Sequence, residues 1–401
     1  MSLSFGTGIL LLLLVAAVVA ILAARLRLPY SVGLVAAGMA LAVFPMAPRI
    51  TLTRELIFDA LLPPLLFEAA FHLRWKELRR ELPVVLTLAS AGVVLSGAVT
   101  AAGMHYVGHW EWSAAVVFGA LIAATDPVSV IAAFREAKVH GRLRLLIESE
   151  SLLNDGTAAV AFGVAVIWAR GGGVTAAGIG GALLLTAGGG IACGLAIGAL
   201  ALFLMGRTED HVTELTFTTL AAYGSFLLAD QLNVSGVFAT IAAGLLLGNC
   251  GAMGRLSDRG REAVEAFWEY AAFVANSLVF LLIGMHEPAQ RLSAFWLPAL
   301  VAVVFVAAGR LVAVYPLCAI FMRSERRVTK AHQDALFWGG LRGALALALA
   351  LGLPKDMPSR TEIVEVSFAV VAFSVFAQGL TIPPLLRAIG EIPRQQGRPP
   401  G

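Results

Sequence analysis

The sequence is divided into thirteen blocks of mostly apolar residues, and most blocks have about the length that a helix needs to cross a lipid bilayer. Hydrophobic residues make up 59% of the 401 residues and charged residues only 14%, whereas soluble domains carry about a quarter charged residues. The pattern therefore predicts an all-α membrane protein. The expected helices lie near residues 5–24, 30–47, 53–73, 83–107, 113–134, 143–169, 174–205, 212–230, 235–250, 263–285, 293–321, 332–353 and 362–388.

The distribution of basic residues predicts how these helices are oriented. If the N-terminus lies outside, most of the 29 Lys and Arg residues fall in cytoplasmic segments, as they do in membrane proteins generally. We therefore expect an outside N-terminus and a cytoplasmic C-terminus. Since no targeting signal is evident, a prokaryotic inner membrane is expected. Residues 1–390 are expected to form a single transmembrane domain, followed by a short cytoplasmic tail over residues 391–401.

The fifth expected helix contains Thr125, Asp126 and Pro127 in its interior. Proline has no amide hydrogen and its ring clashes with the preceding turn, so the helix should break near Thr125. Backbone groups freed at membrane depth are tolerated where they line a cavity or bind a ligand. Thr125 could offer its hydroxyl and its carbonyl to a ligand. Asp126 could act as a ligand or as a local helix cap, and the sequence alone leaves both roles open.

The sixth expected helix carries Glu150, Ser151, Asn154 and Asp155. Ser151 and Asp155 are four residues apart and share one helical face. At a rise of about 1.5 Å per residue, Asp155 lies about 18 Å from the helix start, near the middle of a bilayer. A lone carboxylate at that depth can be neutralised by a proton or by a cation, and the two states exclude each other. A protonated or salt-bridged structural role is the alternative for Asp155.

Among the other charged residues within expected helices, where a charge costs at least about 2.5 kcal/mol, two stand out. Glu68 follows an apolar segment of the third helix and is either a second cation ligand or a side chain that reaches the inner surface. Arg342 lies near the middle of the twelfth helix, among glycines that suggest a second interruption. Because arginine does not lose its proton, Arg342 needs a buried anionic partner, and Glu150 is a plausible one.

The two interrupted helices, the fifth and the twelfth, occupy corresponding positions if helices 1–6 and 8–13 form two repeats joined by helix 7. The single intervening helix makes the second repeat start on the opposite side of the membrane, so the two repeats are expected to be inverted relative to each other. Inverted repeats with broken helices that cross near the midplane are typical of secondary transporters. The fold expected is therefore two inverted six-helix repeats with crossed interrupted helices 5 and 12.

The candidate ligands indicate a hard monovalent cation as the substrate. Asp155, Glu68, Ser151 and Thr125 offer only oxygen atoms, which suit hard cations. The cysteines are isolated and the histidines lie near helix ends or in loops, so no cofactor or resident metal is expected. The sequence contains no segment that resembles a phosphate-binding loop, so an ATP-driven pump is not expected. The small net charge of +3 gives no reason to expect nucleic-acid binding.

Several segments resemble the NhaP-type sodium/proton antiporters, relatives of the animal sodium/hydrogen exchangers. They are Ala124-Thr125-Asp126-Pro127, Glu150-Ser151-Leu152-Leu153-Asn154-Asp155-Gly156, Leu65-Leu66-Phe67-Glu68, Val234-Ser235-Gly236-Val237, 278–284 and Gly340-Leu341-Arg342-Gly343. They occur over nearly the whole chain. The Asn-Asp pair and the Thr-Asp-Pro break are the most specific of them.

The resemblance implies roles for these residues. Asp155, Ser151, Glu68 and the Thr125 main chain are expected to bind the cation, with Asn154 in support. The resemblance further implies a Glu150–Arg342 ion pair, compensation of helix-end dipoles by Asp126, and a homodimer in which a core bundle moves against a dimerisation bundle.

The sequence thus predicts a secondary transporter, not an enzyme. It is expected to exchange Na⁺ or Li⁺ for H⁺ in a lipid membrane, one for one and without net charge movement, by alternating access. A K⁺/H⁺ antiporter is the main alternative. A cation channel is a more distant one, because no carbonyl-filter sequence or ring-forming acidic motif is present.

Overall fold

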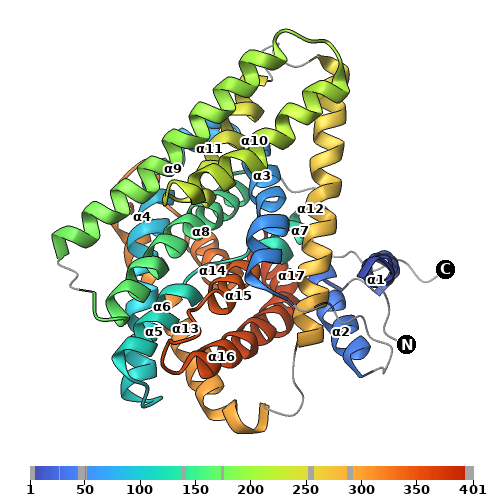
Figure 1. Ribbon diagram of the computed structural model, residues 1–401. Coiled ribbons are helices and arrows are strands. Elements are labelled where there is room, and N and C mark those ends of the chain that lie inside the picture. Colours follow the sequence, from blue (N-terminus) through green and yellow to red (C-terminus); the bar gives the residue numbers. More distant parts are fainter. Residues whose placement is uncertain are drawn as a thin grey trace.

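The structure is a computed structural model that describes residues 5–26, 28–43, 50, 52–136, 141–172, 176–251, 257–286 and 292–392, and these are almost entirely helical (Figure 1). The first half contains α1 (Phe5–Leu26), α2 (Tyr30–Ala42), the π-helical segment η1 (Leu56–Leu61), α3 (Leu62–His72), α4 (Trp75–Thr87), the π-helical segment η2 (Leu88–Gly92), α5 (Val93–Tyr106), α6 (Trp112–Ile122), α7 (Val128–Glu136) and α8 (Arg142–Ala169). The second half contains α9 (Ala176–Met205), α10 (His211–Gln231), α11 (Gly236–Cys250), α12 (Asp258–His286), α13 (Leu292–Ile320), α14 (Lys330–Gly339), α15 (Ala344–Leu351), α16 (Arg360–Phe373), the π-helical segment η4 (Ser374–Gln378) and α17 (Gly379–Ala388).

Each of the thirteen predicted helices corresponds to one of these helices or to consecutive ones. Within the described ranges, eight helices are long and apolar enough to cross a membrane by length and composition. Shorter apolar helices such as α2, α6 and α11 accompany them. The predicted all-α membrane fold is therefore confirmed. The fourth helix begins at Trp75, earlier than the predicted residue 83, because its charged first turns are helical too.

Helix starts follow local capping chemistry. The side chain of Ser235 accepts a hydrogen bond from the amide of Phe238 at 3.2 Å at the start of α11. Thr329 accepts one from the amide of His332 at 3.3 Å at the start of α14. Such bonds satisfy amides that have no partner within the first turn of a helix. These polar residues therefore set where each apolar helix enters the bundle.

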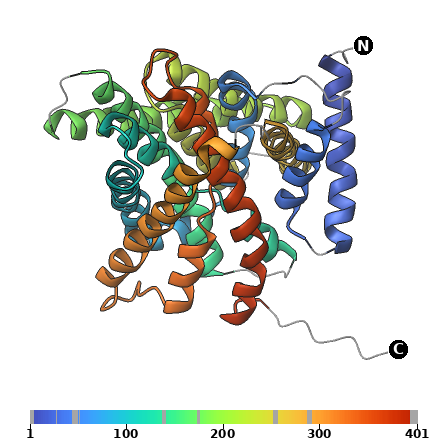
Figure 2. The ribbon, with the colours of Figure 1, turned by 90° about the horizontal axis from the view of Figure 1, so that it is seen from below.

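The helices pack as two groups that meet along one boundary. The core bundle consists of α4–α8 and α13–α17, in which α5 packs on α6 and α13, and α15 packs on α16. The flanking bundle consists of α1–α3 and α9–α12, in which α2 packs on α12 and α3 packs on α11. In Figure 2, α1 and α2 lie at one edge of the molecule and α13 lies toward the opposite one. Contacts of α2 with α7 and of α3 with α8 join the two bundles.

The helix pairs follow an inverted repeat. If α1–α8 corresponds to α10–α17, with α9 as the link, the pair α2 and α12 corresponds to the pair α11 and α3, and both pairs pack closely. In the same correspondence, α5 of the first repeat is equivalent to α13 of the second, and these two helices pack closely on each other as well. The break between α6 and α7 likewise corresponds to the break between α14 and α15. The two interrupted helices therefore take equivalent places in the two repeats.

Candidate ion-binding site

The two broken helices meet at their interruptions. The first break lies between Ile122 and Val128 and the second between Gly339 and Ala344. The extended segments pair antiparallel, and the amide of Asp126 donates to the carbonyl oxygen of Leu341 at 2.8 Å. Pro127 prevents the fifth helix from continuing at this point. The predicted crossing of interrupted helices is thus observed.

Asp126 lies between the two helix N-termini at the crossing. Its Oδ1 accepts a hydrogen bond from the amide of Val128 at 3.0 Å, at the start of α7. A Cβ atom added to Gly343, directly before α15, would lie only 2.1 Å from Oδ2 of Asp126. A carboxylate is favoured beside the positive end of a helix dipole. This geometry suits the predicted compensation of helix ends by Asp126.

Two buried arginines lie at the corresponding C-terminal ends. Nη1 of Arg342 donates to the carbonyl oxygens of Ala123 and Ala124 at 3.0 and 3.1 Å, just beyond the end of α6. Nη2 of Arg310 donates to the carbonyl oxygen of Leu336 at 2.9 Å, in the last turns of α14. Cations stabilise the negative end of a helix dipole. Each half-helix end at the crossing therefore faces a side chain of opposite charge.

The predicted Glu150–Arg342 ion pair is wrong. Glu150 is bound by Arg310 instead, with Nη1 to Oε1 at 2.7 Å and Nη2 to Oε2 at 3.0 Å. Arg310 reaches Glu150 from α13, whereas the guanidinium of Arg342 is occupied with the carbonyls of the broken fifth helix. The sequence did carry a signal, because Arg310 is a charged residue inside an apolar helix.

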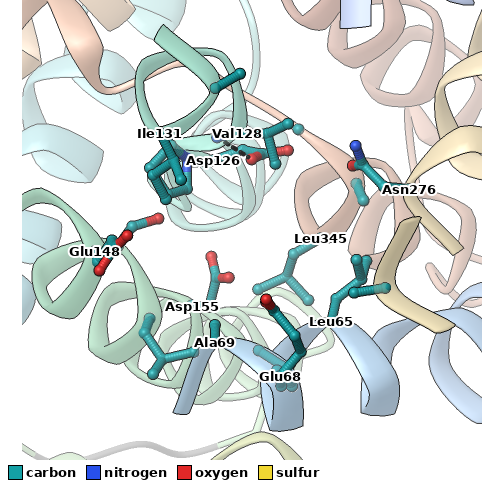
Figure 3. A pocket seen from close by; sticks show the side chains of 18 of the residues that line it. Leu65, Glu68, Ala69, Asp126, Val128, Ile131, Glu148, Asp155, Asn276 and Leu345 are labelled. Carbon is teal, nitrogen blue, oxygen red and sulfur yellow. Dashed lines mark hydrogen bonds between the residues drawn. The ribbon is translucent and has the colours of Figure 1, made fainter. Parts of the chain in front are cut away.

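The predicted cation ligands line one cavity of about 620 Å³ at the crossing. Asp155 from α8, Glu68 from α3 and Asp126 from the first break project toward its centre (Figure 3). Thr125 and Ser151 also contribute to its wall. The cavity therefore brings together all four residues predicted to bind the cation, from three separate parts of the chain.

Ser151 and Thr125 are linked across the first break. The hydroxyl of Ser151 donates to the carbonyl oxygen of Thr125 at 2.5 Å, and the Thr125 hydroxyl donates to Oγ of Ser151 at 3.4 Å. In a continuous helix, the Thr125 carbonyl would accept a backbone hydrogen bond from the next turn. Here the break leaves it free of that bond, and Ser151 of α8 holds it beside the cavity. A hard cation accepts such carbonyl and hydroxyl oxygens as ligands.

Asp155 and Glu68 have different surroundings in the cavity. Within the described residues, no hydrogen bond or salt bridge joins the Asp155 side chain to another residue. Glu68 is 13% exposed, and its Oε1 lies 3.6 Å from Nδ1 of His72, one turn along α3. The Glu68 side chain thus belongs to the cavity wall (Figure 3), which is the place that a second ligand needs.

The predicted supporting residues Asn154, Glu150 and Arg342 lie behind the cavity and do not line it. The amide nitrogen of Asn154 donates to Oε1 of Glu150 at 3.4 Å. Asn154 therefore contacts the Glu150–Arg310 pair and turns away from Asp155. The backbone amide of Arg342 donates a hydrogen bond to Oγ of Ser374 in the π-helical segment η4 at 2.9 Å, which ties the second break to that segment.

The cavity opens toward the side of the molecule that carries the predicted cytoplasmic loops. Its exposed rim includes His72 at the end of α3 and Glu269 and Tyr270 on the first half of α12. Glu148, two turns into α8, also lies at the rim, where Arg144 binds it at 2.7 Å. At the inner end of the cavity, the lining residues Leu345 and Ala346 of α15 are buried.

Sequence reasoning missed two residues near the crossing. Arg310 forms the ion pair described above. Asn276 projects from α12 into the cavity (Figure 3), and its signal was a lone amide in an otherwise apolar stretch of that helix. For both residues the sequence shows an unusual polar side chain but not the helix that it faces.

These features together define a class of membrane protein. Inverted repeats, crossed broken helices and a carboxylate-lined cavity at their crossing are the architecture of a secondary transporter of ions. Residues 10–388 match the family described as "Sodium/hydrogen exchanger, transmembrane". The chain belongs to this family.

Known relatives agree with this assignment. The chain is 38% identical over 371 residues to the Na(+)/H(+) antiporter ApNhaP of Aphanothece halophytica, a match that covers 91% of this chain and 70% of the relative. It is 32% identical over 401 residues to the Na(+)/H(+) antiporter NhaH of Halobacillus aidingensis, covering 95% and 97% of the two chains. Both relatives are named as transporters, in line with the prediction that the protein is not an enzyme.

A solved structure shows the same fold. The sodium proton antiporter MjNhaP1 of Methanocaldococcus jannaschii, solved at pH 8, superposes with a TM-score of 0.74 over 95% of each chain, at 19% sequence identity. At this low identity the likeness concerns the fold alone. It includes nearly the whole length of both chains, so no large part of either fold lies outside the match.

Proposed function

We propose that the protein exchanges Na⁺ for H⁺ across the membrane, with Asp155 as the group that binds either ion. The observation that carries the proposal is the Asp155 carboxylate, which faces a cavity beside the helix crossing without a hydrogen bond or salt bridge to another described residue. The negative charge of a carboxylate is costly in such a place, and either a proton or a bound cation can neutralise it. Because one ion excludes the other, the two fluxes are coupled.

The cation ligands in this proposal are Asp155, Ser151, Glu68 and the carbonyl of Thr125, and Li⁺ is a second substrate. These residues offer hard oxygen ligands from different helices around one cavity. Asn154, Glu150, Arg310, Arg342 and Asp126 hold the ligands in place. They do so through the hydrogen bonds and helix-end contacts around the crossing.

The arrangement of the two bundles supports alternating access as the mechanism that we propose. The exposed lining residues of the cavity lie at one end and its α15 lining is buried, which supports a state in which a cation at Asp155 reaches only one side. Movement of the core bundle against the flanking bundle would open the other side. One carboxylate that releases one proton for each cation moves no net charge, so the exchange is electroneutral. Titration of Glu68 would permit another stoichiometry.

The test is cation-driven proton movement in proteoliposomes loaded with a pH dye, with Na⁺, Li⁺ and K⁺ compared. The wild type is expected to exchange Na⁺ and Li⁺, and Asp155→Asn is expected to be silent. Asp230→Asn changes an exposed carboxylate at the end of α10 and should exchange normally as a matched control. Clamping the membrane potential should leave the rate unchanged. Normal exchange by Asp155→Asn would overturn the assignment of this residue.

Two rival functions give different results in the same experiment. A K⁺/H⁺ antiporter would respond to K⁺ and not to Na⁺. A cation channel would pass single-channel currents across a planar bilayer, and its flux would not saturate as that of an exchanger does. The buried α15 residues at the inner end of the cavity favour the exchanger, because a channel needs a continuous pore.

We further propose that the protein works as a homodimer in a prokaryotic inner membrane, with contacts made by the flanking bundle. Apolar side chains are exposed along α1, among them Leu10, Leu14 and Ile21, and they suit either lipid or a second copy of the chain. The mass of the purified protein, corrected for bound detergent, distinguishes a dimer from a monomer.

A further inference from the structure

Asn276 is a cavity residue to which the proposed exchange mechanism gives no role. It lies on α12 and lines the cavity together with Phe273, one turn earlier on the same helix. In Figure 3 its amide projects into the cavity from a different wall than the Asp155 carboxylate. Asp155 belongs to the core bundle, whereas Asn276 belongs to the flanking bundle.

The residues beside Asn276 fix the rotation of α12. The hydroxyl groups of Ser277 and Tyr30 are hydrogen-bonded at 2.8 Å, and the Tyr30 ring stacks on Phe273 with centroids 5.5 Å apart. Further along, α2 and α12 approach so closely that a Cβ atom on Gly38 would lie 2.2 Å from the carbonyl oxygen of Leu281. Because α12 is held against α2 in this way, Asn276 has a fixed direction into the cavity.

The Asn276 amide has no hydrogen bond to another described residue. Asn249 on α11 shows the usual alternative, since its side chain bonds the amide of Trp75 at 2.8 Å and the carbonyls of Leu73 and Leu245 at 2.9 and 2.8 Å. A polar group in a low-dielectric interior is costly without a partner. The partner of the Asn276 amide therefore comes from the content of the cavity, which is water or a cation.

We infer that Asn276 is a specificity-determining residue for the transported monovalent cation. Its amide oxygen contacts the partly dehydrated ion in the open cavity, from the wall opposite the core-bundle ligands. A neutral oxygen of this kind is a suitable ligand for a hard cation. Because its position is fixed by α2, it suits ions of one size better than others, so that it separates Na⁺ from K⁺. The inference rests on the proposed exchange function.

The experiment measures the concentrations of Na⁺ and K⁺ that give half-maximal exchange in proteoliposomes. Asn276→Ala removes the oxygen, and Asn276→Ser keeps a shorter one. Val274→Ala is the matched control, because Val274 lies on the same helix but does not line the cavity. For Asn276→Ala we expect the half-maximal Na⁺ concentration to rise about fivefold, as for the loss of one neutral polar contact. The maximal rate should stay near that of the wild type.

The ratio of the half-maximal concentrations for Na⁺ and K⁺ should move toward unity in Asn276→Ala and partly recover in Asn276→Ser. Unchanged concentrations for both ions would show that Asn276 binds only water. A lower maximal rate with unchanged concentrations would show a role in the conformational change. Either result overturns the inference.

A second readout separates this inference from the proposed function. Thermal stabilisation of the detergent-purified protein by Na⁺ reports binding without transport. If the wild type is stabilised but does not move protons, the proposed exchange fails, and the comparison with Asn276→Ala still decides the role of Asn276. Weaker stabilisation of Asn276→Ala supports the inference, and equal stabilisation contradicts it.

Discussion

Glu150 and Asp155 lie on the same helix, yet their surroundings give them different chemistry. Both carboxylate oxygens of Glu150 are bound by Arg310, and the pair is buried, with side-chain exposures of 2% and 6%. Asp155 faces the cavity without a hydrogen bond or salt bridge to another described residue. The charge of Glu150 is therefore compensated within the protein by Arg310, whereas Asp155 is left available for the ion binding that we propose.

The Glu150–Arg310 pair predicts a specific pattern of stability. Arg310→Met leaves Glu150 as an unpaired buried charge, which should destabilise the protein by about 3 kcal/mol. Adding Glu150→Gln to Arg310→Met should recover part of this loss, because the unpaired charge is then removed. Thermal unfolding in detergent measures both variants.

The matched comparison is Arg342→Met, which removes the hydrogen bonds to the carbonyls of Ala123 and Ala124. Glu150→Gln should not rescue this variant, because Glu150 is not bonded to Arg342. If Glu150→Gln rescued Arg342→Met but not Arg310→Met, the result would support the Glu150–Arg342 pair predicted from the sequence. It would contradict the Glu150–Arg310 pair seen in the structure.

At the scale of single elements, the crossing depends on a close approach that only a small residue permits. Asp126 faces the start of α15 across Gly343, where a Cβ atom would lie 2.1 Å from Oδ2. The same carboxylate accepts the amide of Val128 at the start of α7. Gly343 thus allows one side chain to serve two half-helices, and the geometry of both breaks is linked through it.

Gly343→Ala should therefore displace Asp126 and disturb the crossing without unfolding the long helices. We expect the maximal exchange rate to fall about tenfold or more, since small misplacements at a site are that costly. Gly224→Ala on α10 is the control, because a Cβ atom there meets nothing within 4 Å. Exchange by Gly343→Ala at the wild-type rate would show that the close approach is not needed.

The start of α10 gives a prediction that depends on pH. Hydrogen bonds from the hydroxyl and amide of Thr213 lower the pKa of Asp210 below its ordinary value of 3.8. The charged cap therefore contributes stability above about pH 4, and the contribution is lost as the pH falls through the lowered pKa. Asp210→Ala should lower the thermal midpoint at pH 7, and the difference from the wild type should shrink at acidic pH.

Asp210→Asn keeps a side-chain acceptor but has no titrating charge, so its thermal midpoint should lack this part of the pH dependence. A constant difference between wild type and Asp210→Ala across the acidic range would show that the charge of the cap is unimportant.

At the scale of the whole molecule, the helices were predictable from the sequence and their mutual rotation was not. Apolar length fixed the thirteen segments, and Pro127 fixed the first break, because both depend on local chemistry alone. The partner of Glu150 depends on which helix approaches α8 at that depth. Local pattern does not specify this, so Arg310 was overlooked and Arg342 was assigned in its place. Asn276 was missed for the same reason.

The orientation of the whole molecule is a prediction from the basic loops that a labelling experiment can check. Lys355 is exposed between α15 and α16, which is an outside segment in this prediction, and Glu209 is exposed between α9 and α10, which is a cytoplasmic one. Each is replaced by cysteine in a background in which Cys193, Cys250 and Cys318 are serines. A membrane-impermeant thiol reagent should label Lys355→Cys in intact cells and Glu209→Cys only after permeabilisation.

The labelling result also decides to which side the cavity opens. Its rim, with Glu148 and Glu269, lies at the same end of the bundle as the predicted cytoplasmic loops. If the labelling agrees, the structure represents a state open to the cytoplasm, and in the proposed mechanism Asp155 would load or release its ion on that side. Labelling of Glu209→Cys in intact cells would invert the orientation, and the same cavity would then be the outward-open one. Control exchange measurements on both cysteine variants exclude misfolding as the cause of either pattern.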